Sequence, residues 1–137
     1  MTQARTQISP MLAVADGKSA IAFYEQAFGA TVNWLIDAGG HVVAGMAIDG
    51  AEFFLADESP ENRVLGPTTA GCTTVRIELF VDDPAAAHAR AVAAGATNRS
   101  AVTRYEYPTT SGKLLRMDQG SVIDPSGHIW LLGRFLD

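Results

Sequence analysis

Arg76 and Glu78 are the residues best placed to do chemistry, because they stand two apart in Val75–Val81, a segment expected to form a β-strand. Alternation along a strand puts residues i and i+2 on the same face. The two side chains could therefore form an ion pair that only holds the sheet, or both could contact a bound molecule. A carboxylate here could neutralise a cationic ligand, or act as a base if burial raised its pKa.

Further candidate ligand-binding residues lie on strands expected to line a cleft or its rim. By alternation, Met11 and Phe80 face the cleft together with Arg76 and Glu78. Aromatic side chains would suit a planar ligand, although ordinary packing explains each of them at least as well. These aromatic candidates are Trp34, Phe53 or Phe54, Tyr105 and Tyr107. Arg116 and Asp118 could stand at the mouth of the cleft or form a solvated charge pair.

Composition narrows the classes of protein and of partner. The 137 residues carry 10 basic and 15 acidic side chains, a net charge of −5, and are 47 % hydrophobic. This fits a compact globular protein rather than a disordered tail. An acidic chain is a poor binder of nucleic acid or of an anionic membrane surface, and no apolar run reaches the length of a membrane helix. A neutral or cationic small molecule remains compatible with the charge.

The usual catalytic and metal-binding motifs are absent from the sequence. It has no glycine-rich nucleotide loop, no Gly-x-Ser-x-Gly and no His-Glu-x-x-His. Cys72 is the only cysteine, so it can form neither an internal disulfide nor a thiol-based zinc site, which favours a cytoplasmic location. His41, His88 and His128 are scattered and are interpreted as surface or structural residues.

The chain contains the same pattern twice. Residues 8–14 and 75–81 each alternate like a strand and lead to Asp16 and Asp83, which are suited to capping a helix. Both helices then end near a Gly-Ala-Thr sequence, where Gly29 and Gly95 are expected to adopt a left-handed conformation.

Three strands are expected after each helix. In the first half they cover residues 31–37, 41–48 and 52–55, with a hairpin at Asp49-Gly50. In the second half they cover residues 97–107, 113–123 and 128–135. The sequence thus predicts an α+β protein of two paired βαβββ modules that form a curled, barrel-like sheet with a central cleft. One domain spans residues 1–137, with modules at about 7–57 and 73–136 and a connector at 58–72.

Two stretches give the sequence a family resemblance. Residues 20–30 (AIAFYEQAFGA) and 124–130 (DPSGHIW) resemble the vicinal oxygen chelate superfamily, which includes glyoxalase I, extradiol dioxygenases, and fosfomycin- and bleomycin-resistance proteins. With residues 79–83 and 93–96 they look most like its PhnB-like branch. The resemblance covers roughly residues 7–136 and implies a cleft built from two modules, and often a homodimer. It does not imply one activity, since this fold supports several.

The resemblance also implies where a metal would bind. Metal-dependent members take ligands from the first and last strand of each module, and counting places these positions at Ser9, Phe54, Arg76 and Leu131. Phenylalanine and leucine have no donor atom, and arginine brings a positive charge. None of the three histidines falls at such a position. No metal and no other cofactor is therefore expected.

Two functions are favoured, beside the alternative of a protein that serves mainly interaction or regulation and has no ligand of note. The first is a metal-free homodimer that sequesters a small, aromatic or cationic molecule in its clefts, using the candidates Met11, Trp34, Phe54, Arg76, Glu78, Tyr105, Arg116 and Leu131. The second is a superfamily enzyme with a displaced metal site, or with Glu78 as a base and Arg76 holding a substrate anion.

Overall fold

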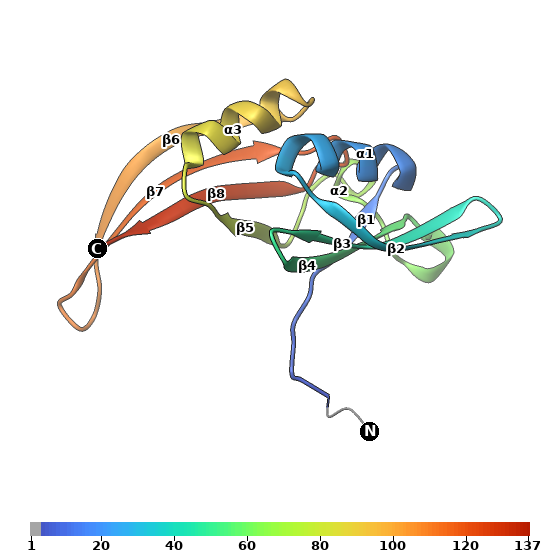
Figure 1. Cartoon of the computed structure of the whole chain (residues 1–137), viewed down its shortest axis with the longest axis horizontal. Helices are drawn as coiled ribbons and strands as arrows, with labels where there is room; N and C mark the ends of the chain where they lie inside the picture. The colour runs from blue at the N-terminus through green and yellow to red at the C-terminus, as the bar shows by residue number, and fades with distance from the viewer. Residues whose placement is uncertain (1–3) are drawn as a thin grey trace.

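The computed structural model describes residues 4–137, which form two four-stranded sheets with helices packed on one side (Figure 1). In chain order the elements are β1 (Met11–Val14), α1 (Gly17–Phe28), β2 (Thr31–Ala38), β3 (His41–Ile48), β4 (Ala51–Asp57), the 3₁₀ turn η1 (Pro60–Asn62), α2 (Pro67–Ala70), β5 (Arg76–Phe80), α3 (Pro84–Ala93), β6 (Thr97–Pro108), β7 (Leu114–Ile123) and β8 (Ile129–Leu136).

The two sheets have the same topology. Sheet 1 has the strand order β1-β4-β3-β2, and sheet 2 has the order β5-β8-β7-β6. In each, the first strand pairs in parallel with the last strand of its module, and the remaining pairs are antiparallel. The repeat and the α+β class predicted from the sequence are therefore confirmed.

Local sequence signals explain where the helices and the tightest turn form. Asp16 and Asp83 accept hydrogen bonds from the backbone N–H groups of the first helical turns of α1 and α3, at 3.0 Å in each case. Gly29 ends α1 at φ 66°, as expected for a left-handed cap. Gly95 also has a positive φ, but Ala94 is the residue that caps α3, in a right-handed conformation. Asp49 and Gly50 both have positive φ, which is the backbone that a two-residue hairpin turn requires.

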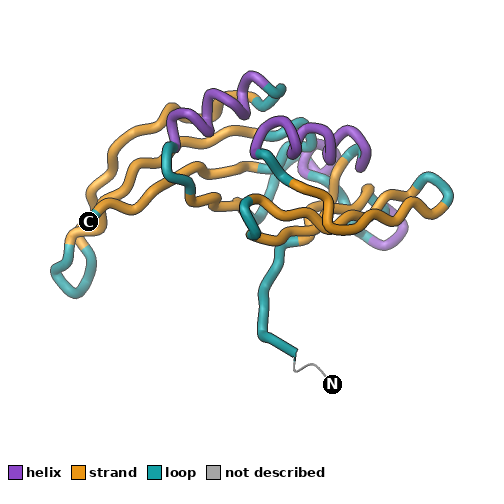
Figure 2. Tube along the Cα trace, viewed as in Figure 1, coloured by secondary structure: helices purple, strands orange, loops and turns teal. Residues whose placement is uncertain are grey.

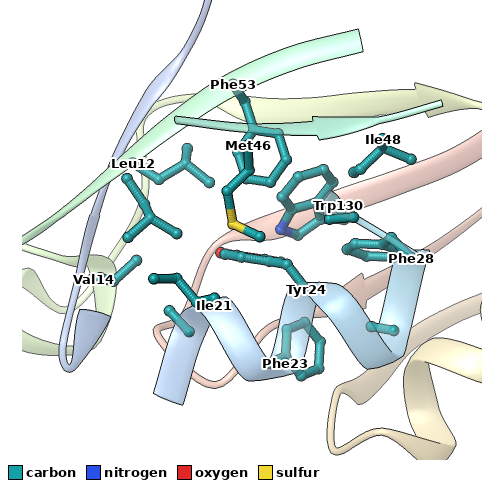
Figure 3. Packing of buried hydrophobic residues seen from close by; sticks show 14 of the residues in the cluster. Leu12, Val14, Ile21, Phe23, Tyr24, Phe28, Met46, Ile48, Phe53 and Trp130 are labelled. Carbon is teal, nitrogen blue, oxygen red and sulfur yellow. The ribbon is translucent and has the colours of Figure 1, made fainter. Parts of the chain in front are cut away.

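The apolar core lies between the helices and the inner faces of both sheets (Figure 3). Tyr24 and Phe28 of α1 contact Trp130 of β8, with ring centroids 5.4 and 4.7 Å apart. Phe53 of β4 contacts both Trp130 and Tyr24, with ring centroids 5.6 and 5.3 Å away. Trp130 is only 1 % exposed. The two modules therefore share one core, and the prediction that Trp130 faces the helices is confirmed.

A buried carboxylate, Asp124, joins the two modules by hydrogen bonds. Tyr24 of α1 donates its hydroxyl to Asp124 at 2.5 Å, and the indole N–H of Trp130 donates at 2.9 Å. The backbone N–H groups of Ser126 and His128 donate to the other oxygen at 2.9 and 3.0 Å. Burial and the negative charge of Asp124 raise the pKa of Tyr24 well above its ordinary value. The Asp-Pro-Ser-Gly turn is thereby fixed against the first helix.

Two features differ from the sequence expectation. Residues 8–14 were expected to form one strand, but β1 begins only at Met11, and Ile8 is 94 % exposed in a segment that extends away from the sheets (Figure 1). No described strand pairs with residues 4–8, so the alternating apolar residues of this segment have no sheet face or helix to pack against. The sheets are curled as expected, but they lie side by side with their helices on one side and leave their opposite faces open (Figure 2).

Candidate functional site

The candidate site is built from the open faces of the two sheets, meaning the faces opposite the helices. In sheet 1, the strand register places four residues in one row across the sheet. Met11 pairs with Phe54, Phe54 with Gly45, and Gly45 with Trp34. Because paired residues share a face, the predicted candidates Met11, Phe54 and Trp34 come together on one surface.

Trp34 lies flat across the sheet because Gly45 has no side chain. A Cβ atom at Gly45 would come within 2.4 Å of the indole Nε1 of Trp34. The indole therefore reaches the neighbouring strand, where its centroid is 5.7 Å from the ring of Phe54. Trp34 keeps 42 % of its surface exposed. This pair of rings forms an apolar platform with one uncovered side.

In sheet 2, a polar centre lies on the open face. Glu78 of β5 pairs with Leu131 of β8, so these two candidates share the open face. Gln119 of β7 pairs with Gly133, which lies two residues after Leu131 on β8. The side-chain amide of Gln119 donates a hydrogen bond to Glu78 at 2.6 Å. A neutral amide holds the carboxylate in place without neutralising its charge. Glu78 is half-buried, so it can still contact a molecule on this face.

Aromatic side chains lie on one side of this polar centre, toward the end of β8. Phe80 and Phe135 stack with centroids 4.9 Å apart, and Tyr105 and Tyr107 stack at 5.8 Å. Tyr105 pairs with Met117, and Met117 pairs with Phe135, so the two aromatic pairs share the open face. Sequence reasoning placed Phe80 on the cleft side but did not select it, and it missed Phe135 and Gln119. Phe135 lies four residues after Leu131 on the same strand, so alternation places both side chains on the same face and could have predicted it.

The ion pair considered for Arg76 and Glu78 does not form, and Arg116 and Asp118 form ion pairs with other residues rather than with each other. Arg76 and Glu78 form no ion pair, although they share a face. Among the described residues the ion pairs are Lys18–Asp37, Arg104–Asp118 and Arg116–Glu106. Arg76 is exposed, and Gln119 takes its expected place beside Glu78.

Arg116 lies on the helix side of sheet 2, not beside Glu78. It pairs with Leu136, which lies four residues after the core residue Leu132 on β8 and therefore on the same face of the sheet. Its guanidinium donates to Glu106 at 3.1 Å. The neighbouring Arg104 lowers the pKa of Asp118 by a hydrogen bond and by its charge. These charges form a surface network on the opposite face from the aromatic residues.

The residues at the four metal-ligand positions do not fit a metal ion. Phe54 and Leu131 occupy equivalent places on the last strand of their modules. Phe54 pairs with Met11 of β1, and Leu131 pairs with Glu78 of β5. Ser9 accepts a hydrogen bond from Gln7, and Arg76 carries a positive charge. Within residues 4–137, no three His, Cys, Asp or Glu side chains are grouped so that they could hold a metal.

Two of the three histidines have hydrogen-bond partners in the fold, and the third is exposed on the surface. His128 is buried, and its Nε2 lies 2.7 Å from the carbonyl oxygen of Ala13, which links the last turn to β1. His88 lies 3.0 Å from the side-chain oxygen of Asn98. His41 is exposed at the start of β3.

Comparison with known proteins identifies the family. The family model of the Glyoxalase/Bleomycin resistance protein/Dioxygenase superfamily matches residues 6–132. The chain belongs to this superfamily. It is 37 % identical over 132 residues to Mb0911c, an uncharacterized protein of Mycobacterium bovis, which covers 93 % of this chain and 82 % of the relative.

Solved structures support the same fold. TioX from a Micromonospora species superposes with a TM-score of 0.68 at 22 % identity, covering 96 % of this chain and all of that one. The fosfomycin resistance protein FosX of Listeria monocytogenes superposes with a TM-score of 0.69 at 15 % identity, covering 98 % of this chain and 96 % of that one.

None of the described helices has the length and apolar character to span a bilayer.

Proposed function

We propose that this superfamily member is a metal-independent binding protein that holds a small organic molecule against the open faces of its sheets. One observation carries the proposal. At the positions where metal-dependent relatives need donor atoms, this chain has Phe54 and Leu131, which add to an aromatic surface instead. Ligand sites are typically apolar with a few placed polar groups, and Glu78 held by Gln119 is such a group.

The same geometry supports a homodimer. Within one chain the two open faces lie side by side, so each leaves exposed aromatic residues such as Trp34, Phe80 and Phe135. A second copy related by a two-fold axis could place sheet 1 of one chain against sheet 2 of the other and enclose two equivalent clefts. We further propose that the chain falls in the PhnB-like branch, from residues 20–30, 79–83, 93–96 and 124–130 together. From its single cysteine, Cys72, we propose that it acts in the cytoplasm, as one domain.

Tryptophan fluorescence provides a direct test. Trp34 is exposed in the site, whereas Trp130 is buried in the core, so ligand contact should quench Trp34 selectively. We expect neutral and cationic aromatic compounds that raise the melting temperature to quench the signal in the wild type but not in Trp34→Phe. Light scattering should give a dimer at micromolar concentration.

Metal analysis decides the other part of the proposal. Protein purified without chelator should contain no transition metal at one equivalent per chain. One tightly bound metal per chain would refute the metal-independent reading. A stable monomer at micromolar concentration would refute the dimer.

A second function is favoured by one observation, the half-buried position of Glu78 on the open face. In this alternative, Glu78 acts as a general base on a substrate bound beside it. Activity on thiol adducts of 2-oxoaldehydes, or on activated epoxides, would reveal such an enzyme. If Glu78→Gln left that activity unchanged, Glu78 would not be the base.

A further inference from the structure

A hollow lies at the junction of the two modules, next to Glu78. Its volume is about 560 Å³, which is within the range of small-molecule sites. It is bounded on one side by the tight turn between β3 and β4, and on the other by the end of β5 and the last part of β8. The residues that matter for its chemistry are Asp49, Glu78, Phe80, Asp82, Arg134 and Phe135.

The aromatic wall of this hollow leaves ring surface available. Phe80 and Phe135 stack at 4.9 Å with an interplanar angle of 26°, yet they are 51 % and 53 % exposed. Their contact therefore covers only part of each ring. The face of a benzene ring is electronegative and attracts cations, most strongly when the cation is weakly hydrated.

The charges around the hollow favour the same kind of ligand. Three carboxylates, Asp49, Glu78 and Asp82, and one cation, Arg134, line the hollow, and their formal charges sum to −2. None of these four belongs to an ion pair among the described residues. Arg134 donates to the carbonyl oxygen of Asp82 at 2.8 Å, so its guanidinium is bound to the backbone at the rim.

A metal ion would suit this hollow poorly. The three carboxylates are not grouped closely enough to form a coordination site within residues 4–137. The two phenylalanines offer no donor atom, whereas they suit alkyl groups on a cationic nitrogen.

We propose that this hollow is a cation subsite that binds an alkylated ammonium group of the ligand. Phe80 and Phe135 would contact the alkyl groups, and Glu78, fixed by Gln119, would supply a placed negative charge. The inference rests on the proposed function and specifies its ligand class: an organic cation whose apolar remainder extends over the open face.

A matched pair of probes isolates the positive charge. Choline and 3,3-dimethylbutan-1-ol have the same shape, but the second has carbon in place of the charged nitrogen. Titration followed by amide chemical shifts should show saturable binding of choline, with shifts at Phe80 and Phe135, and binding of the neutral probe at least fivefold weaker. Added salt should weaken only choline binding.

Variants test each contact separately. Glu78→Gln keeps the shape but removes the charge, and Phe135→Leu keeps the apolar surface but removes the ring. Each should weaken choline binding by about three- to tenfold, and each should weaken binding of the neutral probe less. Glu25→Gln, which removes a carboxylate from the exposed side of α1, is the matched control and should bind choline like the wild type. Circular dichroism would establish that every variant is folded.

The outcomes separate this inference from the proposed function. Equal affinities for the two probes, no saturable choline binding, or choline binding unaffected by both Glu78→Gln and Phe135→Leu would overturn the cation subsite. Selective quenching of Trp34 by neutral aromatic compounds would still support the proposed function in those cases. If no compound quenched Trp34 while choline bound with the expected preference, the subsite would stand and the wider ligand-binding face would fail.

Discussion

Replacing Asp124 with alanine should be among the most damaging single changes to the stability of this protein. Asp124 is 3 % exposed and accepts four hydrogen bonds. Alanine would leave the Tyr24 hydroxyl and the Trp130 indole N–H buried without an acceptor, each costing roughly 1–3 kcal/mol, and would also orphan two backbone N–H groups. We expect a loss of about 4–6 kcal/mol, which is much of the roughly 5–15 kcal/mol that stabilises a typical domain.

A graded series makes this expectation testable by urea unfolding at one fixed protein concentration. Asp124→Asn keeps one accepting oxygen, and Tyr24→Phe removes only one donor, so each should cost about 1.5–3 kcal/mol. Glu25→Ala, on the exposed side of α1, is the control and should change stability by less than about 0.5 kcal/mol. A loss below about 1 kcal/mol for Asp124→Ala would show that the buried network does not join the modules as described.

Three further predictions concern other positions. Gly45→Ala should push the Trp34 indole off sheet 1 and shift its fluorescence, and an unchanged spectrum would contradict the packing. Because the folded-state pKa of Tyr24 is raised, its stabilising contribution should be complete below pH 10 and fall as the pH rises further; in a pH series of unfolding free energies Tyr24→Phe should lack this fall. Asp57→Asn should cost about 1–2 kcal/mol in urea unfolding, because Asp57 accepts backbone N–H bonds at 2.6 and 2.7 Å from the start of α1 and from β3, and an amide can accept only one of them.

The features predictable from the sequence are those that depend on local physics. Caps at Asp16 and Asp83, the Asp49-Gly50 turn and the alternation around Trp130 each involve residues close in sequence, so the pattern contains the information. Together with the repeat, they were enough to predict the order of strands and helices in both modules.

Features that depend on strand register were harder to predict. The face of sheet 2 on which Arg116 lies follows from its pairing with Leu136. The pairing of β6 with β7 shifts register at two places, so counting residues along these strands does not tell which face a side chain is on. Similarly, Glu78 is held by Gln119, 41 residues away, rather than by the nearby Arg76. Local spacing favoured the wrong partner because only the folded sheet brings Gln119 within reach.

The link between Tyr24 and Asp124 also has a consequence for synthesis on the ribosome. The two residues are 100 positions apart. At roughly 5–20 residues per second, the aromatic side of α1 waits about 5–20 s for the last turn and β8 to emerge. During that time Tyr24 and Phe28 lack Trp130, the ring that covers them in the folded chain. The nascent first module is therefore a natural substrate for chaperones that bind exposed aromatic residues, and completion of the core is tied to translation of the final strand.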